Sequence, residues 1–205
     1  LPHTSTLITL EFMTELDAPE AELYPTSPEL SDDWESFSIQ INDAVYTLPL
    51  PLADFLDDGW VISAEDAGLS LPGAEGPYAS YEQAWVSLTN DREQDISVCV
   101  FNTTESAIPA AEGTVGGIHV IYGNYDFSGT ELRLPGGLML GWSTREDVLK
   151  LYGQPNDSFE ATYGGYSLKY EIDDPLDPAS WKLGFDDSGI LDDVMVHHQA
   201  YFRSD

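Results

Sequence analysis

Apolar residues alternate with polar ones through much of this chain, which is the pattern of β-strands that bury one face. The alternation is clearest near the C-terminus, where residues 166–172 read YSLKYEI. Turn-forming residues bound each alternating run, as they do at the ends of strands. The runs predicted to be strands are residues 37–41, 45–48, 84–88, 96–101, 118–122, 166–172, 181–185 and 191–197.

The strongest helix signal lies between Leu140 and Pro155. Ser143 and Glu146 have the S-x-x-E spacing of a capping box, in which each side chain satisfies a backbone donor of the first turn. Gly153 can adopt the left-handed conformation that ends a helix, and Pro155 prevents its continuation. The segment therefore predicts one short helix that begins at Ser143 and ends at Gly153.

A Leu-Pro step, a helix signal and a series of strands occur twice in the same order. The first series follows Leu48-Pro49 and has its helix end at Gly59; the second follows Leu134-Pro135 and has its helix end at Gly153. This order predicts an α+β fold of two tandem units, each a short helix packed on one face of an antiparallel sheet. The expected divisions are an N-terminal strand and acidic, Pro-containing connector at 1–33, a first unit at 34–129 and a second unit at 130–205.

In the second unit, the strand period of two sends several polar side chains to the face away from the helix. The candidate binding residues on this face are Lys169, Glu171, Lys182, Met195 and His197. They are interpreted either as a binding surface for a protein or peptide or as a ladder of ordinary cross-strand charge pairs. Each pair in such a ladder contributes about 0.2–1 kcal/mol.

The same counting in the first unit gives a more apolar outer face, made of Trp85, Cys99, Phe101, His119 and Ile121. A face of this composition is expected to be buried, either by the N-terminal strand or by the second unit. The alternative is an interaction patch. Cys99 is the single cysteine of the chain and is predicted to be a sheltered thiol, because no basic neighbour would stabilise a thiolate.

The formal charge of −30 arises from 37 acidic residues against seven basic ones. Such a surface repels phosphate backbones and anionic membranes, so nucleic acid is not an expected partner. It suits a soluble extracellular protein and is compatible with weak association of divalent cations. No apolar run approaches the ~18 residues of a membrane span, so no membrane insertion is expected. The abrupt start at Leu1 is compatible with an export signal or lipid anchor upstream.

Catalytic and metal-binding patterns are not found in the sequence, and no cofactor is expected. The four histidines are His3, His119, His197 and His198, and the adjacent pair points to opposite faces of a strand. With 37 acidic residues, a pair of carboxylates suited to glycan hydrolysis can be drawn almost anywhere. The sequence therefore predicts a protein that is not an enzyme.

Several motifs resemble a known family. The helix motif G-x-S-x-x-E-D-V-x-x-x-Y-G-x-P at 141–155 looks like that of small bacterial envelope lipoproteins of the SmpA/OmlA and beta-lactamase-inhibitor-protein-like superfamily. F-x-x-x-G at 185–189, followed by V-x-V at 194–196, is similar to the hairpin that closes that repeat. Y-x-L-P at 46–49 and F-x-x-x-G-W at 55–60 resemble uncharacterised exported lipoproteins of Gram-positive, Clostridia-type bacteria.

The resemblance implies a tandem repeat whose open sheet face binds another protein, and it implies no catalytic residues. The chain lacks the paired cysteines usual in the inhibitor, so inhibition of a beta-lactamase is not implied. The expected function is therefore a non-enzymatic exported domain of the cell envelope or extracellular space that binds a protein or peptide. Two alternatives stay open, namely a structural or ion-buffering wall protein and a two-carboxylate glycan hydrolase.

Overall fold

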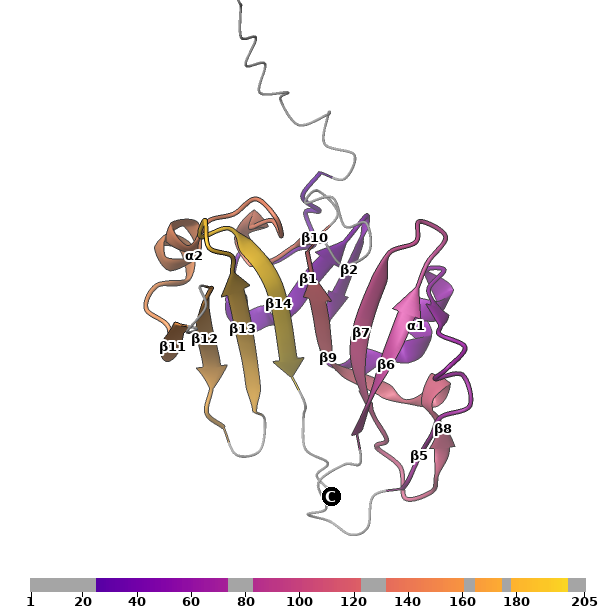
Figure 1. Cartoon of the computed structure of the whole chain (residues 1–205). Coiled ribbons are helices and arrows are strands. Elements are labelled where there is room, and N and C mark those ends of the chain that lie inside the picture. The colour runs from indigo at the N-terminus through magenta and orange to yellow at the C-terminus, as the bar shows by residue number, and fades with distance from the viewer. Residues whose placement is uncertain (1–24, 74–82, 123–131, 161–164, 175–177, 199–205) are drawn as a thin grey trace, which may run out of the picture.

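The chain has an α+β fold built on a large antiparallel sheet (Figure 1). The computed structural model describes residues 25–73, 83–122, 132–160, 165–174 and 178–198. Within these ranges lie two α-helices, α1 (Leu52–Asp57) and α2 (Arg145–Tyr152). The short 3₁₀ turns are η1 (Trp34–Ser36), η2 (Ala110–Glu112) and η3 (Pro135–Gly137).

The large sheet has nine strands, all paired antiparallel. Eight of them follow the order β11-β12-β13-β14-β9-β7-β6-β4, and β3 pairs with β9 beside this path. Their bounds are β3 (Leu50–Pro51), β4 (Val61–Ile62), β6 (Gln83–Thr89), β7 (Asp95–Phe101), β9 (Thr114–Ile121), β11 (Asp157–Glu160), β12 (Tyr166–Ile172), β13 (Ala179–Phe185) and β14 (Leu191–His198).

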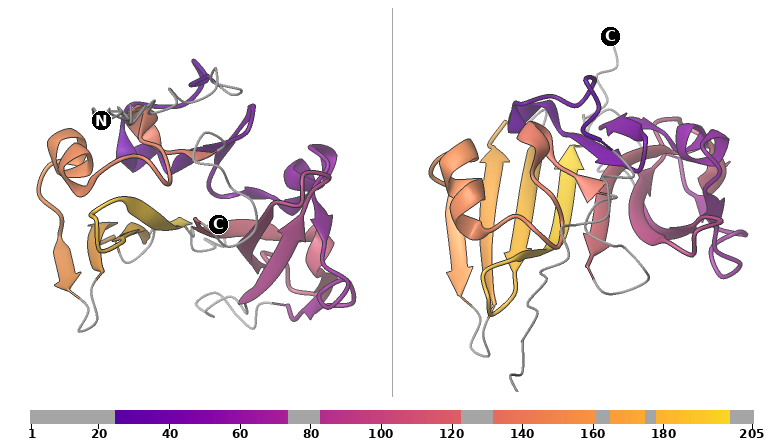
Figure 2. Two further views of the ribbon diagram at one scale, coloured as in Figure 1. Left: turned by 45° about the horizontal axis from the view of Figure 1, so that its top comes forward. Right: turned by 90° about the horizontal axis from the view of Figure 1, so that it is seen from above.

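Two smaller sheets complete the described strands. β10 (Leu132–Arg133), β1 (Ser38–Ile41) and β2 (Ala44–Thr47) form a three-stranded sheet in that order. β5 (Ser70–Leu71) pairs with β8 (Ile108–Pro109). In Figure 2, α2 and the three-stranded sheet lie on the same side of the large sheet.

One hydrophobic core fills the space between the large sheet and these covering elements. Every second residue of the long strands points into it, as Trp181 and Leu183 of β13 illustrate. α1 contributes Phe55 and α2 contributes Val148 to the same cluster. The indole N–H of Trp181 donates to the Trp34 carbonyl at 2.9 Å, which satisfies the polar edge of a fully buried ring. Full burial of side chains of this size stabilises a fold by about 1.5–3 kcal/mol each.

The large sheet runs without a break through both units predicted from the sequence. β14 of the second unit pairs with β9 of the first, and Met195 lies opposite His119. The small sheet also joins the two units, since Gln40 of β1 lies opposite Arg133 of β10. The two halves therefore share one sheet and one core.

The predicted strands are present, with ends that differ by at most four residues; β12 matches its prediction, and β9 differs most because it begins at Thr114. The strand expected near the N-terminus lies outside the described residues. The cap predicted for the second helix is wrong by one position. Thr144 is the N-cap, its hydroxyl accepts from the Asp147 N–H at 3.2 Å, and the Asp147 carboxylate accepts from the Thr144 N–H at 2.9 Å. Ser143 does not cap the helix, because its hydroxyl accepts a hydrogen bond from the Met139 N–H at 2.8 Å.

Candidate binding surface on the open sheet face

The face of the large sheet opposite the core is the candidate site, and we call it the open face. In the part of the chain that the structure describes, both helices and the three-stranded sheet pack against the other face. The open face carries large apolar side chains that reach solvent. Trp85 is 42% exposed, Ile121 38% and Phe159 66%. These three residues come from β6, β9 and β11, so the exposed apolar surface extends over most of the width of the sheet.

The five candidate residues predicted from the sequence all lie on the open face. Lys169 of β12 is directly opposite Lys182 of β13, and Lys182 is in turn opposite Met195 of β14. Glu171 of β12 and His197 of β14 both lie opposite Ser180 of β13, one on each side. The strand period therefore predicted which face these residues share, and the register of β12, β13 and β14 brings them together.

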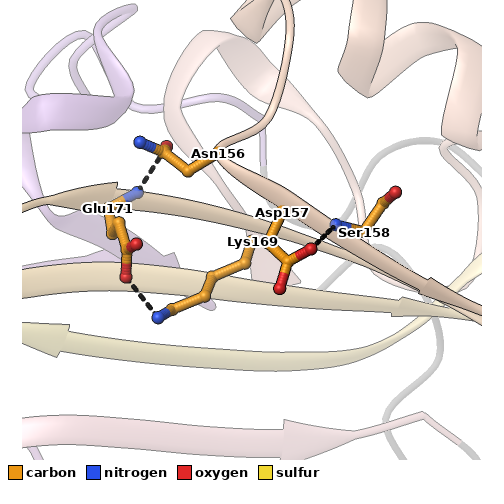
Figure 3. Close-up of polar contacts among 5 residues, drawn as sticks. All are labelled: Asn156, Asp157, Ser158, Lys169 and Glu171. Carbon is orange, nitrogen blue, oxygen red and sulfur yellow. Dashed lines mark hydrogen bonds and ion pairs between the residues drawn. The ribbon is translucent and has the colours of Figure 1, made fainter.

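The ionic contacts of these residues run along a strand more than across strands. Figure 3 shows the Lys169 ammonium paired with the Glu171 carboxylate, two residues further along β12. The Glu171 N–H donates to the Asn156 side-chain oxygen at 2.9 Å, and the Asp157 carboxylate accepts from the Ser158 N–H at 2.8 Å. A ladder of opposite charges between β12 and β13 is not formed, because two lysines face each other there.

The outer face of the first unit differs from its prediction. Cys99 and Phe101 are buried as expected, but Trp85 and Ile121 are exposed. The prediction had the N-terminal strand or the second unit cover this face, with an interaction patch as the alternative; the N-terminal strand lies outside the described residues. Instead, the second unit joins edge to edge through β14 and β9, and thus extends the same face.

Aromatic and titratable side chains meet at the centre of the open face. The Trp85 ring lies edge-on to the rings of His197 and His119, with centroids 5.4 and 6.3 Å apart. His119 Nε2 is 2.9 Å from the Asp193 carboxylate. Gly117 makes this packing possible, because a Cβ there would lie 2.9 Å from the His197 ring. Burial, and then the charge of His119, holds the pKa of His197 below its ordinary value, so its imidazole is neutral at neutral pH.

Sequence reasoning did not find this central cluster as a unit. Trp85, His119 and Asp193 come from three strands, and the last two residues are 74 positions apart. Each strand's own alternation shows which residues share a face, but it contains no information on which strand of the other half is the neighbour. The alternation did predict that Trp85 and His119 share a face, although that face was expected to be buried.

The cluster offers little for nucleophilic or metal chemistry. The Cys99 thiol donates to the Gln83 side-chain oxygen at 3.4 Å, and burial raises its pKa to about 11. A thiol of this kind is a poor nucleophile, because the thiolate is the reactive form. Among the described residues, no group of three or more His, Cys, Asp or Glu side chains is placed to hold a metal ion.

One hollow lies away from the open face, at the start of α2. Its volume is ≈ 570 Å³. There the guanidinium carbon of Arg145 lies 4.5 Å from the centroid of the Tyr166 ring. Its other polar lining is mostly carboxylate, from Glu146, Glu160, Asp186 and Asp187. Three further hollows lie on the open face. Phe159, Ser167 and Lys182 line those of ≈ 140 and ≈ 360 Å³. Lys169, Glu171 and His197 line the third, of ≈ 300 Å³.

Comparisons with known proteins do not extend this picture. No protein-family model, curated protein or solved structure matches the chain. Within the described residues, no helix is both long and apolar enough to cross a membrane.

Proposed function

We propose that this chain is a non-enzymatic binding domain that holds a protein or peptide on the open face. The observation that carries the proposal is the solvent-exposed Trp85 on β6, whose ring reaches His119 and His197 on the open face. Exposed aromatic residues with apolar and polar neighbours are typical of the residues that dominate binding energy at protein interfaces. Ile121 and Phe159 add apolar surface toward β11, and His119 and His197 support the indole from the side.

The proposal includes an architecture of two related units of the beta-lactamase-inhibitor-protein-like kind. The order of the strands supports it, because β11-β12-β13-β14 and β4-β6-β7-β9 meet at β14 and β9 as mirror-image series. In each half, one helix comes before the four strands: α1 before β4 and α2 before β11. The family that the helix motif resembles uses an open sheet face to bind another protein. On the same resemblance and the charge of −30, we assign the domain to the cell envelope or the extracellular space.

The test is capture of partners from the source organism's envelope and culture fluid on three immobilised proteins. These are the unaltered chain, W85A and, as a matched control, W142A. Trp142 is 47% exposed, similar to Trp85, but it lies in the turn before α2. We expect a discrete protein to be retained at about 1 M salt, where exposed charge interactions are screened, by the unaltered chain and W142A. W85A should retain at least about tenfold less, since central aromatic residues contribute 2 kcal/mol or more.

Two outcomes would count against the proposal. Equal retention by W85A and W142A would move the binding site away from the open face. Retention of basic proteins alone, all released by salt, would mean that the acidic surface acts as an ion exchanger, which favours a structural or ion-buffering wall protein. Circular dichroism of both variants checks that the fold is intact.

A further inference from the structure

We infer that the open face recognises an acidic segment of its partner, with a carboxylate of that segment held by Lys182 and an apolar neighbour packed against Phe159. The inference rests on the proposed function and specifies the chemistry of the partner. It starts from the charges on β11 to β14, which are few and mostly satisfied.

Three carboxylates that share the open face with Lys182 already have partners. Glu171 is paired with Lys169, Asp193 with His119, and Asp157 accepts a backbone N–H from Ser158. Lys182 is exposed, and among the described residues it has no ion-pair or hydrogen-bond partner.

The position of Lys182 also works against stability. Its cross-strand neighbour on β12 is Lys169, and like charges directly opposite each other destabilise a sheet. A carboxylate placed beside Lys182 would offset this repulsion and would form a charge-assisted hydrogen bond. The Lys169–Lys182 pair therefore lowers the stability of the free chain, and a bound anionic group would offset that loss.

Apolar surface flanks the Lys182 ammonium group. Of the two hollows that Lys182 lines, the smaller, of ≈ 140 Å³, also has Phe159 and Lys169 in its lining. The larger, of ≈ 360 Å³, is lined by Phe159, Gly184 and Ile121, with the carboxylates Asp192 and Asp193 at the β14 side. Gly184 carries no side chain, and a Cβ there would lie 2.8 Å from the Asp193 Cβ. The larger hollow is therefore not narrowed by a side chain at this position. A peptide with a carboxylate next to an aromatic or branched apolar side chain fits this combination of charge and shape.

The net charge of the chain favours a partner segment with one or two carboxylates over a polyanionic partner. At −30, the chain repels a nucleic acid or another densely charged anion over the whole approach. One or two carboxylates in an otherwise apolar segment meet less of this repulsion and still reach Lys182. The partner segment is therefore acidic at one point and apolar around it.

The test uses three fluorescein-labelled nine-residue peptides and the intact chain, with binding measured by fluorescence anisotropy. The peptides share a Gly/Ser framework with a central Phe-X-Ile, where X is Glu, Gln or Lys. We expect the Glu peptide to bind the unaltered chain about tenfold more tightly than the Gln peptide, and the Lys peptide to bind least. In K182E the order should reverse, with the Lys peptide preferred.

The matched control is K150E, which changes the net charge by the same amount on the exposed side of α2. It should keep the preference of the unaltered chain. Three outcomes would overturn the inference. The unaltered chain could prefer the Lys peptide, none of the three peptides could bind, or K182E and K150E could change the preference in the same way. If the capture experiment yields a Trp85-dependent partner that K182E retains fully, the inference fails and the proposed function stands. If no such partner is captured, the proposed function itself fails.

Discussion

Cys99 illustrates at the scale of single residues how an outward-pointing position can still be buried. It belongs to the outer row of β7, yet only 1% of it is exposed. Gly117 on the neighbouring strand allows the His197 ring to approach, and a Cβ at Gly117 would lie 3.0 Å from the Cys99 Cβ. The small thiol is therefore enclosed by the tryptophan and histidine packing at the centre of the open face.

Because Cys99 is enclosed in this way, its thiol is expected to react slowly with thiol reagents. With its pKa raised to about 11 by burial, Cys99 should carry about 100-fold less thiolate at pH 8 than a thiol at the ordinary value of 9.0. We expect Ellman's reagent to react with the folded protein at least ~100-fold more slowly than with the protein unfolded in urea, and C99S gives the background. Similar rates in the two states would mean that the thiol is open to solvent.

The same residue scale shows what the sequence could predict of the site. Alternation along β12 to β14 correctly predicted that Lys169, Lys182 and His197 share a face. It could not predict that two lysines would be direct neighbours, because that depends on the register between strands. The central cluster depends further on the pairing of β14 with β9, which no local pattern contains.

At the scale of elements, the start of α2 shows how tertiary contacts choose between two similar local signals. Ser143 with Glu146 and Thr144 with Asp147 both have the spacing of a capping box. The Ser143 hydroxyl is used by the Met139 N–H, which leaves Thr144 to cap the helix one residue later. The sequence thus predicted the existence and type of this helix, and the neighbouring turn determined its first residue.

The contribution of this cap to the free energy of unfolding can be measured. We expect T144A and D147A each to lower the free energy of unfolding by about 1 kcal/mol, the usual cost of removing an N-cap group. E146A, the matched control, should change it by less than about 0.5 kcal/mol, as is usual for surface substitutions. Urea unfolding followed by circular dichroism measures all three. A larger loss in E146A than in D147A would contradict the observed cap and favour the one predicted from the sequence.

At the scale of the whole molecule, the two halves depend on each other through two sheets. β14 pairs with β9 in the large sheet, and β1 pairs with β10 in the small one. The α+β class could be predicted, since helix signals and alternating runs are local properties of the sequence. The way in which the halves join could not be predicted, because His119 and Asp193 are 74 residues apart and each half has several strands that could form the junction.

This shared architecture predicts a single cooperative unfolding transition. Since both sheets and the core span the two halves, neither half can lose its structure without exposing the other. Urea unfolding followed by tryptophan fluorescence should coincide with the transition seen by far-ultraviolet circular dichroism. Two separate transitions, or different midpoints for the two signals, would indicate that the halves unfold independently.

The central pairing of β9 with β14 also protects the chain from aggregation. Strand edges with unpaired N–H and C=O groups bind other strands readily, including those of identical molecules. In this sheet the two long central edges satisfy each other within one polypeptide, and one end of the sheet is the two-residue β4. A chain broken between β9 and β10 would leave each fragment with a long bare edge. Such fragments would associate with copies of themselves, so continuity of the polypeptide is itself a means of keeping these two edges paired with each other.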